Sequence, residues 1–236
     1  MSSKQYKLIS FTLGVCLIAV VAAANAEKSL GTKTVNIYDQ NRMHAVTITK
    51  VIVAGEQIQP GVSTGGVQEV RQGTPFQADD EWLRKTSIIL QNRTDRMIVR
   101  AEIMLLFPDA GDGSASRPLM EYMITLGQRP EINGYKSRGE KLRAEPDKKA
   151  LLFAPGQTLV VPLADYIDSI QPMIEYKQPL SQITRLVIRP LQFYFVDGMR
   201  WDENGFAAPD TDHPGQYKNL GPKFFPGDQS RNWPPQ

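Results

Sequence analysis

The sequence predicts an all-β protein, a mostly antiparallel β-sandwich with one short helix. The first supporting observation is the stretch 85–107, where two segments of alternating apolar residues flank a polar turn at 92–95, which predicts a central β-hairpin. In the second segment Arg100 and Glu102 fall opposite the apolar positions, the two-residue period of a strand with one side in a core. The inward positions are Val99, Ala101, Ile103, Leu105 and Phe107, with Ile88 and Leu90 on the same face of the partner strand.

Two further segments carry a strand signal. In 120–126, Met120, Tyr122, Ile124 and Leu126 alternate with Glu121, Met123 and Thr125. The stretch 184–196 is a long run rich in aliphatic and aromatic residues. About 210 residues follow the first 26, enough for one sandwich-sized core.

Residues 1–26 have the features of a cleavable secretory signal. Lys4 and Lys7 precede an apolar run, 11–24, and the segment ends in Ala24-Asn25-Ala26. The run is shorter than the roughly 20 residues that span a bilayer, although an uncleaved anchor stays open. Cys16 lies inside the run and is the only cysteine, so the exported domain is expected to have no disulfide, thiol catalysis or cysteine metal site.

The expected domain plan has four parts. After the signal at 1–26 comes a mobile lead-in, 27–45, then the β-sandwich, 46–208, and finally an irregular tail rich in Pro, Gly and aromatic residues, 209–236.

The first firm strand is expected at 46–53, which is rich in β-branched residues. The stretch 56–80 contains several Gly and Pro turns and is expected to be loop-like, with a short strand at 67–70. After the two strands of 85–107, a turn cluster at 108–113 leads to the strand 120–126. The charged stretch 127–149 has almost no apolar residues and is interpreted as a solvated, mobile loop.

The second half of the chain contains the helix and the last long strand. Segments 151–153 and 158–163 are expected to pair around Pro155-Gly156. Apolar residues then recur at helical spacing over 166–174, and Pro172 inside this pattern favours a kinked helix or two successive turns that cap an open end of the sandwich. In 184–196 the apolar parity changes at Pro190, which predicts a β-bulge there. Trp201 begins the return strand, and Asn204-Gly205 offers a turn.

Several local signatures, in order along 75–217, resemble those of exported bacterial β-sandwich proteins that have no assigned biochemical function. The signatures are Pro75-Phe76 with Asp79-Asp80 and Trp82-Leu83; Leu90-x-Asn92-x-Thr94; Leu105-x-Phe107-Pro108; Arg117-Pro118 with Leu126-Gly127; Ile183-Thr184-Arg185; Phe195-x-Asp197-Gly198 with Trp201; and Asp210-x-Asp212-x-Pro214-Gly215. The resemblance implies an immunoglobulin-like antiparallel β-sandwich and export to the periplasm or the extracellular space, assuming bacterial origin. It implies no activity.

The charge balance argues against a nucleic-acid-binding protein. The chain has 27 basic and 25 acidic residues, and loss of Lys4 and Lys7 makes the numbers equal. A nucleic-acid-binding domain would carry a basic excess. Lys136, Arg138, Lys141 and Arg143 form a basic run, but only Tyr135 stands among them for stacking, so a solvated loop is favoured over polyanion binding.

No catalytic or metal-binding set stands out, and no cofactor is expected. Only two histidines are present, His44 and His213, and no sequence element presents a serine nucleophile. Asp210, Asp212 and His213 could hold a cation, but further calcium ligands do not follow, so a turn is favoured. The acidic run 79–81 is interpreted as a solvated strand end next to an inward-facing Trp82, and Asn92-Arg93-Thr94 as a turn rather than a glycosylation site.

The aromatic residues near the end of the chain could either fasten the tail to the core or form a platform for a sugar or a partner. The candidate contact residues are Trp201, Phe206, Tyr217, Trp233, Tyr135 and Arg138. The sequence thus predicts a non-catalytic exported protein that binds a protein or cell-envelope component through a loop end or a sheet edge. The alternatives are a carbohydrate-binding or carbohydrate-acting protein that uses these aromatics, and a metal-dependent hydrolase.

Overall fold

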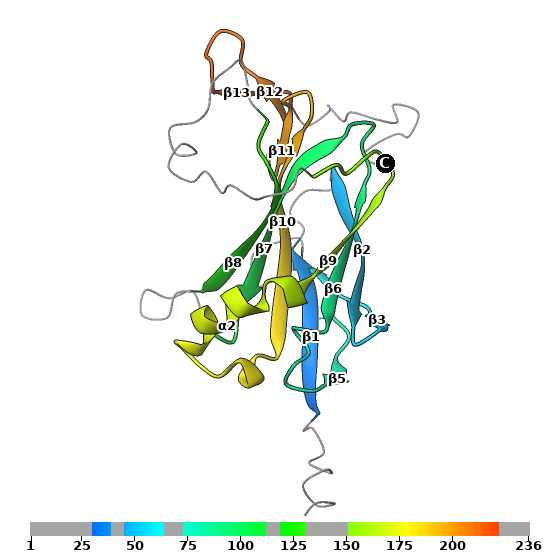
Figure 1. The fold of residues 1–236 in the computed structure, drawn as a ribbon, viewed down its shortest axis with the longest axis vertical. Helices are drawn as coiled ribbons and strands as arrows, with labels where there is room; N and C mark the ends of the chain where they lie inside the picture. Colours follow the sequence, from blue (N-terminus) through cyan, green and yellow to red (C-terminus); the bar gives the residue numbers. More distant parts are fainter. Residues whose placement is uncertain (1–29, 39–44, 64–72, 112–118, 131–150, 222–236) are drawn as a thin grey trace, which may run out of the picture. The chain divides into compact units, whose positions relative to one another are not determined.

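The computed structural model describes residues 30–38, 45–63, 73–111, 119–130 and 151–221. The chain divides into two units, Met1–Leu30 and Gly31–Gln236, and the fold below is that of the second. In the described ranges its strands form two sheets, and one helix, α2 (Ile167–Glu175), accompanies them (Figure 1). The predicted all-β sandwich with one short helix is confirmed.

The smaller sheet has the order β3-β2-β6-β9, all antiparallel. Its strands are β2 (Val46–Val53), β3 (Glu56–Ile58), β6 (Thr86–Asn92) and β9 (Thr158–Pro162). Along β6 every second residue from Thr86 is buried, which places Ile88 and Leu90 in the core as their alternation predicted.

The larger sheet is built around β10 (Arg185–Phe195), the long central strand in Figure 1. On one side β10 pairs with β7 (Ile98–Phe107), which pairs in turn with β8 (Met120–Gly127). On its other side β10 pairs first with β1 (Gly31–Tyr38) and further along with β11 (Arg200–Asp202). The remaining strands are β4 (Gly61–Ser63), β5 (Phe76–Ala78), β12 (Gly205–Pro209) and β13 (Tyr217–Asn219).

Side chains from both sheets share one hydrophobic core. Val51 of β2, Leu90 of β6 and Val161 of β9 are buried with Ile103 of β7 and Phe193 of β10. Ala101, Ile103, Leu105 and Phe107 of β7 all lie in this core, as their alternation predicted. One core between two sheets is what makes the fold a sandwich.

The prediction that 85–107 forms a hairpin is wrong. β6 belongs to the smaller sheet and β7 to the larger one, so the turn between them crosses from one sheet to the other. Asn92, which is buried, holds this corner. Its Nδ2 donates to the carbonyl oxygens of Arg96 (2.7 Å) and Phe153 (2.9 Å), while its Oδ1 accepts from the Thr94 backbone (3.0 Å) and hydroxyl (2.8 Å).

The predicted domain start at residue 46 is also corrected. β1 lies within the larger sheet, parallel to both β10 and β4. Its inward face begins with Lys33, which is buried and donates from Nζ to the carbonyl oxygens of Ser181 (3.5 Å) and Ile183 (3.3 Å). A charged residue at an inward position hides the strand pattern, which explains why the segment resembled a polar lead-in.

Pro190 lies at the predicted bulge. Pro190 is opposite Ile103 and Gln192 is opposite Glu102, so Leu191 is the extra residue. On the other side of β10, pairing with β1 ends at Ile188 and pairing with β11 begins at Gln192. The proline thus lies between the part of β10 that pairs with β1 and the part that pairs with β11. No neighbouring strand needs a hydrogen bond from its backbone nitrogen there, so the missing N–H costs nothing.

The helix and the tail differ in part from expectation. The helix α2 is a single helix of nine residues with the exposed Pro172 inside it, preceded by a 3₁₀ turn at Leu163–Asp165. Ile167, Ile170 and Ile174 face the core.

The tail is not wholly irregular, because β13 pairs with β12. Segment 151–153 does not pair with β9; instead Phe153 bridges Ile98 of β7. The predicted strand at 67–70 lies outside the described residues.

Candidate functional site

A second bulge shapes the first residues of β7. Tyr194 lies opposite Arg100 and Phe195 opposite Ile98, which leaves Val99 as the extra residue. Beyond it the parity is reversed, so Ile98 is buried in the core and Val99 is partly exposed. The prediction that Val99 shares the inward face of Ile103 is therefore wrong, because a bulge turns one side chain out of the alternation.

Gly127, the last residue of β8, lets the chain pass close to this bulge. Its φ is +71°, and a Cβ added to it would lie 2.0 Å from the Val99 carbonyl oxygen and 2.6 Å from Leu151 Cβ. The next residue, Gln128, donates its N–H to the same Val99 oxygen at 3.2 Å. Only a residue without a side chain fits at this place.

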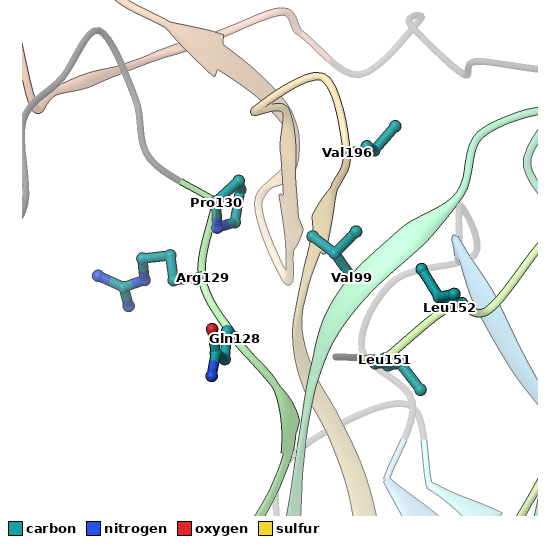
Figure 2. A pocket seen from close by; sticks show the side chains of 7 residues that line it. All are labelled: Val99, Gln128, Arg129, Pro130, Leu151, Leu152 and Val196. Atoms are coloured by element: carbon teal, nitrogen blue, oxygen red, sulfur yellow. The ribbon is translucent and has the colours of Figure 1, made fainter. Parts of the chain in front are cut away.

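Between these segments lies an open, mainly apolar cavity of about 240 Å³, called here the Val99 hollow. Its lining residues come from the start of β7, the segment after β8, the segment before Phe153 and the residue that follows β10 (Figure 2). They are Val99, Gln128, Arg129, Pro130, Leu151, Leu152 and Val196. Two of the apolar side chains are unusually accessible, Leu152 at 66% and Val196 at 61%.

Arg129 links the Val99 hollow to the neighbouring polar face of the sheet. Figure 2 shows its guanidinium pointing away from Val99. The guanidinium carbon lies 4.6 Å from the centre of the Tyr194 ring. Burial raises the pKa of Tyr194 to about 12, against the opposing effect of the Arg129 charge. The phenol is therefore neutral at ordinary pH and its hydroxyl donates to Gln192 Oε1 at 2.6 Å.

The same polar face continues across β11 and β13. Arg200 stacks on Tyr217 at 4.4 Å from the ring centre and pairs with Asp202 at 2.9 Å. Arg100 pairs with Glu102 at 2.7 Å. The charges of these two arginines are thus matched by neighbouring carboxylates, which makes the face a compensated network rather than a strong anion site.

The lining of the Val99 hollow suits contact rather than bond-making chemistry. Apart from Arg129 its side chains are aliphatic, proline or a neutral amide. None of these groups is a nucleophile or a general base at neutral pH. In the ranges that the structure describes, no group of three or more His, Cys, Asp or Glu side chains gathers as a metal ion requires.

The structure places the predicted contact residues in three different situations. Trp201 and Phe206 are 1% and 0% exposed and belong to the core, so neither offers a surface to a ligand. Trp201 packs on Phe193 at 5.5 Å between ring centres, and Phe206 on Phe195 at 5.8 Å. Tyr217 is partly exposed and stacks with Arg200. Trp233, Tyr135 and Arg138 lie outside the described residues.

These positions correct the sugar-platform hypothesis. Trp201 and Phe206 were two of its aromatic contacts, and their burial removes them. Both instead pack in the core, where Trp201 of β11 and Phe206 of β12 are buried against aromatic residues of β10.

The other polar candidates have structural partners. Asp210 Oδ1 accepts from the Asp212 backbone at 2.9 Å, and Asp210 Oδ2 lies 3.0 Å from His213 Nδ1. The hydrogen bond from His213, followed by that from Asp212, lowers the pKa of Asp210. This is the turn that the sequence favoured.

In the acidic run 79–81, Asp79 pairs with Lys85. The neighbouring Trp82 is buried, and its Nε1 donates to the Ile183 carbonyl oxygen at 3.0 Å. His44 lies outside the described residues.

Sequence reasoning missed the Val99 hollow because its residues resemble ordinary strand ends. Gly127 was the one signal that could have indicated it, as a glycine directly after an apolar strand.

None of the helices in the described ranges has the length and apolar character that a bilayer crossing requires. Comparison of the chain with family models, curated proteins and solved structures finds no match.

Proposed function

We propose that the protein is exported and acts without catalysis, binding a protein of the cell envelope that inserts an apolar side chain into the Val99 hollow. The observation that carries this proposal is the combination of an open apolar cavity with two accessible aliphatic side chains, Leu152 and Val196, at its rim. Clustered exposed apolar side chains beside a cavity are typical of interaction sites.

The size of the Val99 hollow favours one inserted side chain. An apolar cavity of about 150 Å³ is enough for a benzene ring, so about 240 Å³ accommodates a Phe or Leu side chain. Pockets for drug-sized ligands and cofactors are usually larger, about 300–1,000 Å³. Burying one such side chain contributes roughly 1.5–3 kcal/mol, the scale of an interface hot spot.

The rim adds one polar group that could fix the orientation of a partner. Gln128 supplies a side-chain amide, whereas the Arg129 guanidinium points away from Val99 and lies over the Tyr194 ring. A peptide segment with one large apolar residue beside a hydrogen-bond acceptor matches this arrangement.

Substitution of the rim tests the binding site. We expect Leu152→Asp combined with Val196→Asp to reduce capture of the envelope partner at least about tenfold, because a charged side chain then has to be desolvated on binding. The matched control is Val160→Asp on β9, an exposed aliphatic residue that does not line the Val99 hollow. Capture is measured with tagged protein, and a photo-crosslinking residue at Leu152 identifies the contact. Unchanged capture by the double variant would refute the proposal.

Export is checked independently. We expect the protein in the periplasmic or secreted fraction with Glu27 as its first residue, which N-terminal sequencing reads directly. Recovery of intact chain only from the cytoplasm would contradict export without bearing on the Val99 hollow.

A further inference from the structure

β8 is an unusual edge strand. In the described ranges it pairs only with β7. The other strands with one neighbour are short, since β3, β4, β5 and β13 have three residues each, and β9 has five and ends at Pro162. By contrast β8 has eight residues, no proline, no basic residue and one charge, Glu121. Long edges without such protection accept a further strand.

The free edge of β8 presents the backbone groups of alternate residues. Gln128 donates its N–H to Val99, and Pro190, which has no N–H, lies opposite Ile103. Both facts indicate that odd-numbered residues of β7 bond to even-numbered residues of β8. In an antiparallel pair the intervening residues direct their N–H and C=O to the other side. Glu121, Met123 and Thr125 therefore present these groups at the free edge.

We propose that β8 is a dimerisation strand, with β8 of a second copy adding antiparallel about a two-fold axis at Met123. This register pairs all seven residues from 120 to 126 and leaves out Gly127, whose positive φ interrupts the strand. The larger sheets of the two subunits then join into one continuous sheet. This is an isologous interface, the kind most common in homodimers.

The side chains of β8 are self-complementary in this register. On the inner face Tyr122 lies opposite Ile124 of the partner subunit, apolar against apolar. On the outer face Met123, which is 44% exposed, lies against Met123 of the partner subunit. The single charge, Glu121, lies opposite the hydroxyl of Thr125 of the partner subunit rather than another carboxylate. Directly opposed like charges destabilise a strand pair, so this register avoids the one available clash.

The occupant is a second copy rather than an unrelated strand for two reasons. The complementarity is internal to one eight-residue sequence, which needs no partner residue from elsewhere. The exported chain, without Lys4 and Lys7, has equal numbers of basic and acidic residues, so two copies carry no net charge that would repel them.

Analytical ultracentrifugation of the exported protein tests the dimer. We expect a concentration-dependent monomer–dimer equilibrium. Met123→Pro should make the protein monomeric, because it removes an edge donor while leaving the bonds between β7 and β8 in place. Unchanged circular dichroism and thermal unfolding of this variant confirm that the monomer is folded.

A charge pair tests the register itself. Thr125→Glu opposes Glu121 of the partner subunit twice per dimer and should weaken dimerisation about tenfold, whereas Thr125→Lys should strengthen it by a similar factor. A further readout is a short bismaleimide cross-link through Met123→Cys, which is the one cysteine of the exported protein once residues 1–26 are removed. A monomer at all concentrations, a dimer insensitive to Met123→Pro, equal effects of the two Thr125 variants, or cross-linking of residue 123 to a different protein would each overturn the proposal.

Discussion

At the residue scale, the shape of the Val99 hollow depends on a side chain that is missing. Gly127 combines a positive φ with contacts that leave no room for a Cβ, whereas Gly156 has nearly the same φ, +70°, and nothing within 4 Å. The two glycines therefore separate the cost of backbone conformation from the cost of steric overlap.

We expect Gly156→Ala to cost about 1–2 kcal/mol, the penalty of the left-handed conformation alone. Gly127→Ala should cost about 3 kcal/mol or more, because overlap with Val99 and Leu151 adds to that penalty. Urea unfolding of both variants measures the difference. Equal losses would show that the chain relaxes freely around residue 127, contrary to the close packing of the Val99 hollow.

Residue-level pattern predicted much of the core but not the Val99 hollow. The alternation in β7 placed Ala101, Ile103, Leu105 and Phe107 correctly. It failed at Val99 because a bulge depends on the opposing strand, which a local pattern does not contain. Trp201 was ambiguous for a related reason, since a large aromatic side chain suits a core and a binding surface equally well.

At the element scale, Asp109 ties the turn after β7 to the start of β10. Its Oδ2 accepts from the Thr184 N–H (2.7 Å), the Thr184 hydroxyl (2.9 Å) and the Arg185 N–H (2.8 Å), and its Oδ1 from Arg185 Nε (2.6 Å). Burial alone would raise the pKa of Asp109, but the hydrogen bonds from Thr184 and Arg185 outweigh it and lower the pKa below 3.8.

The lowered pKa predicts a specific pH dependence. Because the folded pKa lies below the unfolded one, the carboxylate stabilises the fold fully above the unfolded value of about 3.8 and loses this effect as pH falls through the folded pKa. We expect Asp109→Asn to cost about 2 kcal/mol at neutral pH, with the difference from the unchanged protein shrinking on acidification. Unfolding free energies across the acid range measure this.

The control for Asp109 is Asp168→Asn, since Asp168 is an exposed carboxylate paired with Arg84. This variant should change stability little at any pH, as is usual for surface ion pairs. A cost for Asp109→Asn that stays constant down to strong acid would contradict the assignment.

Element types were easier to predict from the sequence than element partners. The strand 46–53 was indicated by its β-branched residues, 184–196 by its apolar run, and 120–126 and the helix after Leu163 by periodicity. The partners of β6 and β7 were not indicated, because alternation states which face is buried and not which strand lies alongside. β6 pairs with β2 and β9, and β7 pairs with β10 and β8, instead of with each other. β1 was missed because Lys33 occupies one of its inward positions.

At the scale of the whole molecule, β1 connects the start of the described sequence to β10, a strand far along the chain. Val35 is buried in the common core, and β1 has β10, β4 and β5 as neighbours. A sandwich that began at residue 46 would expose the flank of β10 and leave part of the core open to water.

Truncation measures how much the fold depends on this strand. A chain beginning at Glu27 should fold, whereas a chain beginning at Val46 should lack cooperative unfolding and aggregate, because the unpaired edge of β10 and the uncovered core become accessible. Soluble yield and thermal unfolding followed by circular dichroism distinguish the two. Cooperative unfolding of the shorter chain would restore residue 46 as the domain boundary.

The pairing of β1 with β10 also sets an order of events in biogenesis. Thr34 donates its N–H to the carbonyl oxygen of Thr184, a residue synthesised 150 positions later. The first strand therefore has to wait for most of the chain before its main neighbour exists. Contacts so distant along the sequence slow folding. A chain that folds slowly stays unfolded for longer, which fits the proposal that this protein is exported before it folds.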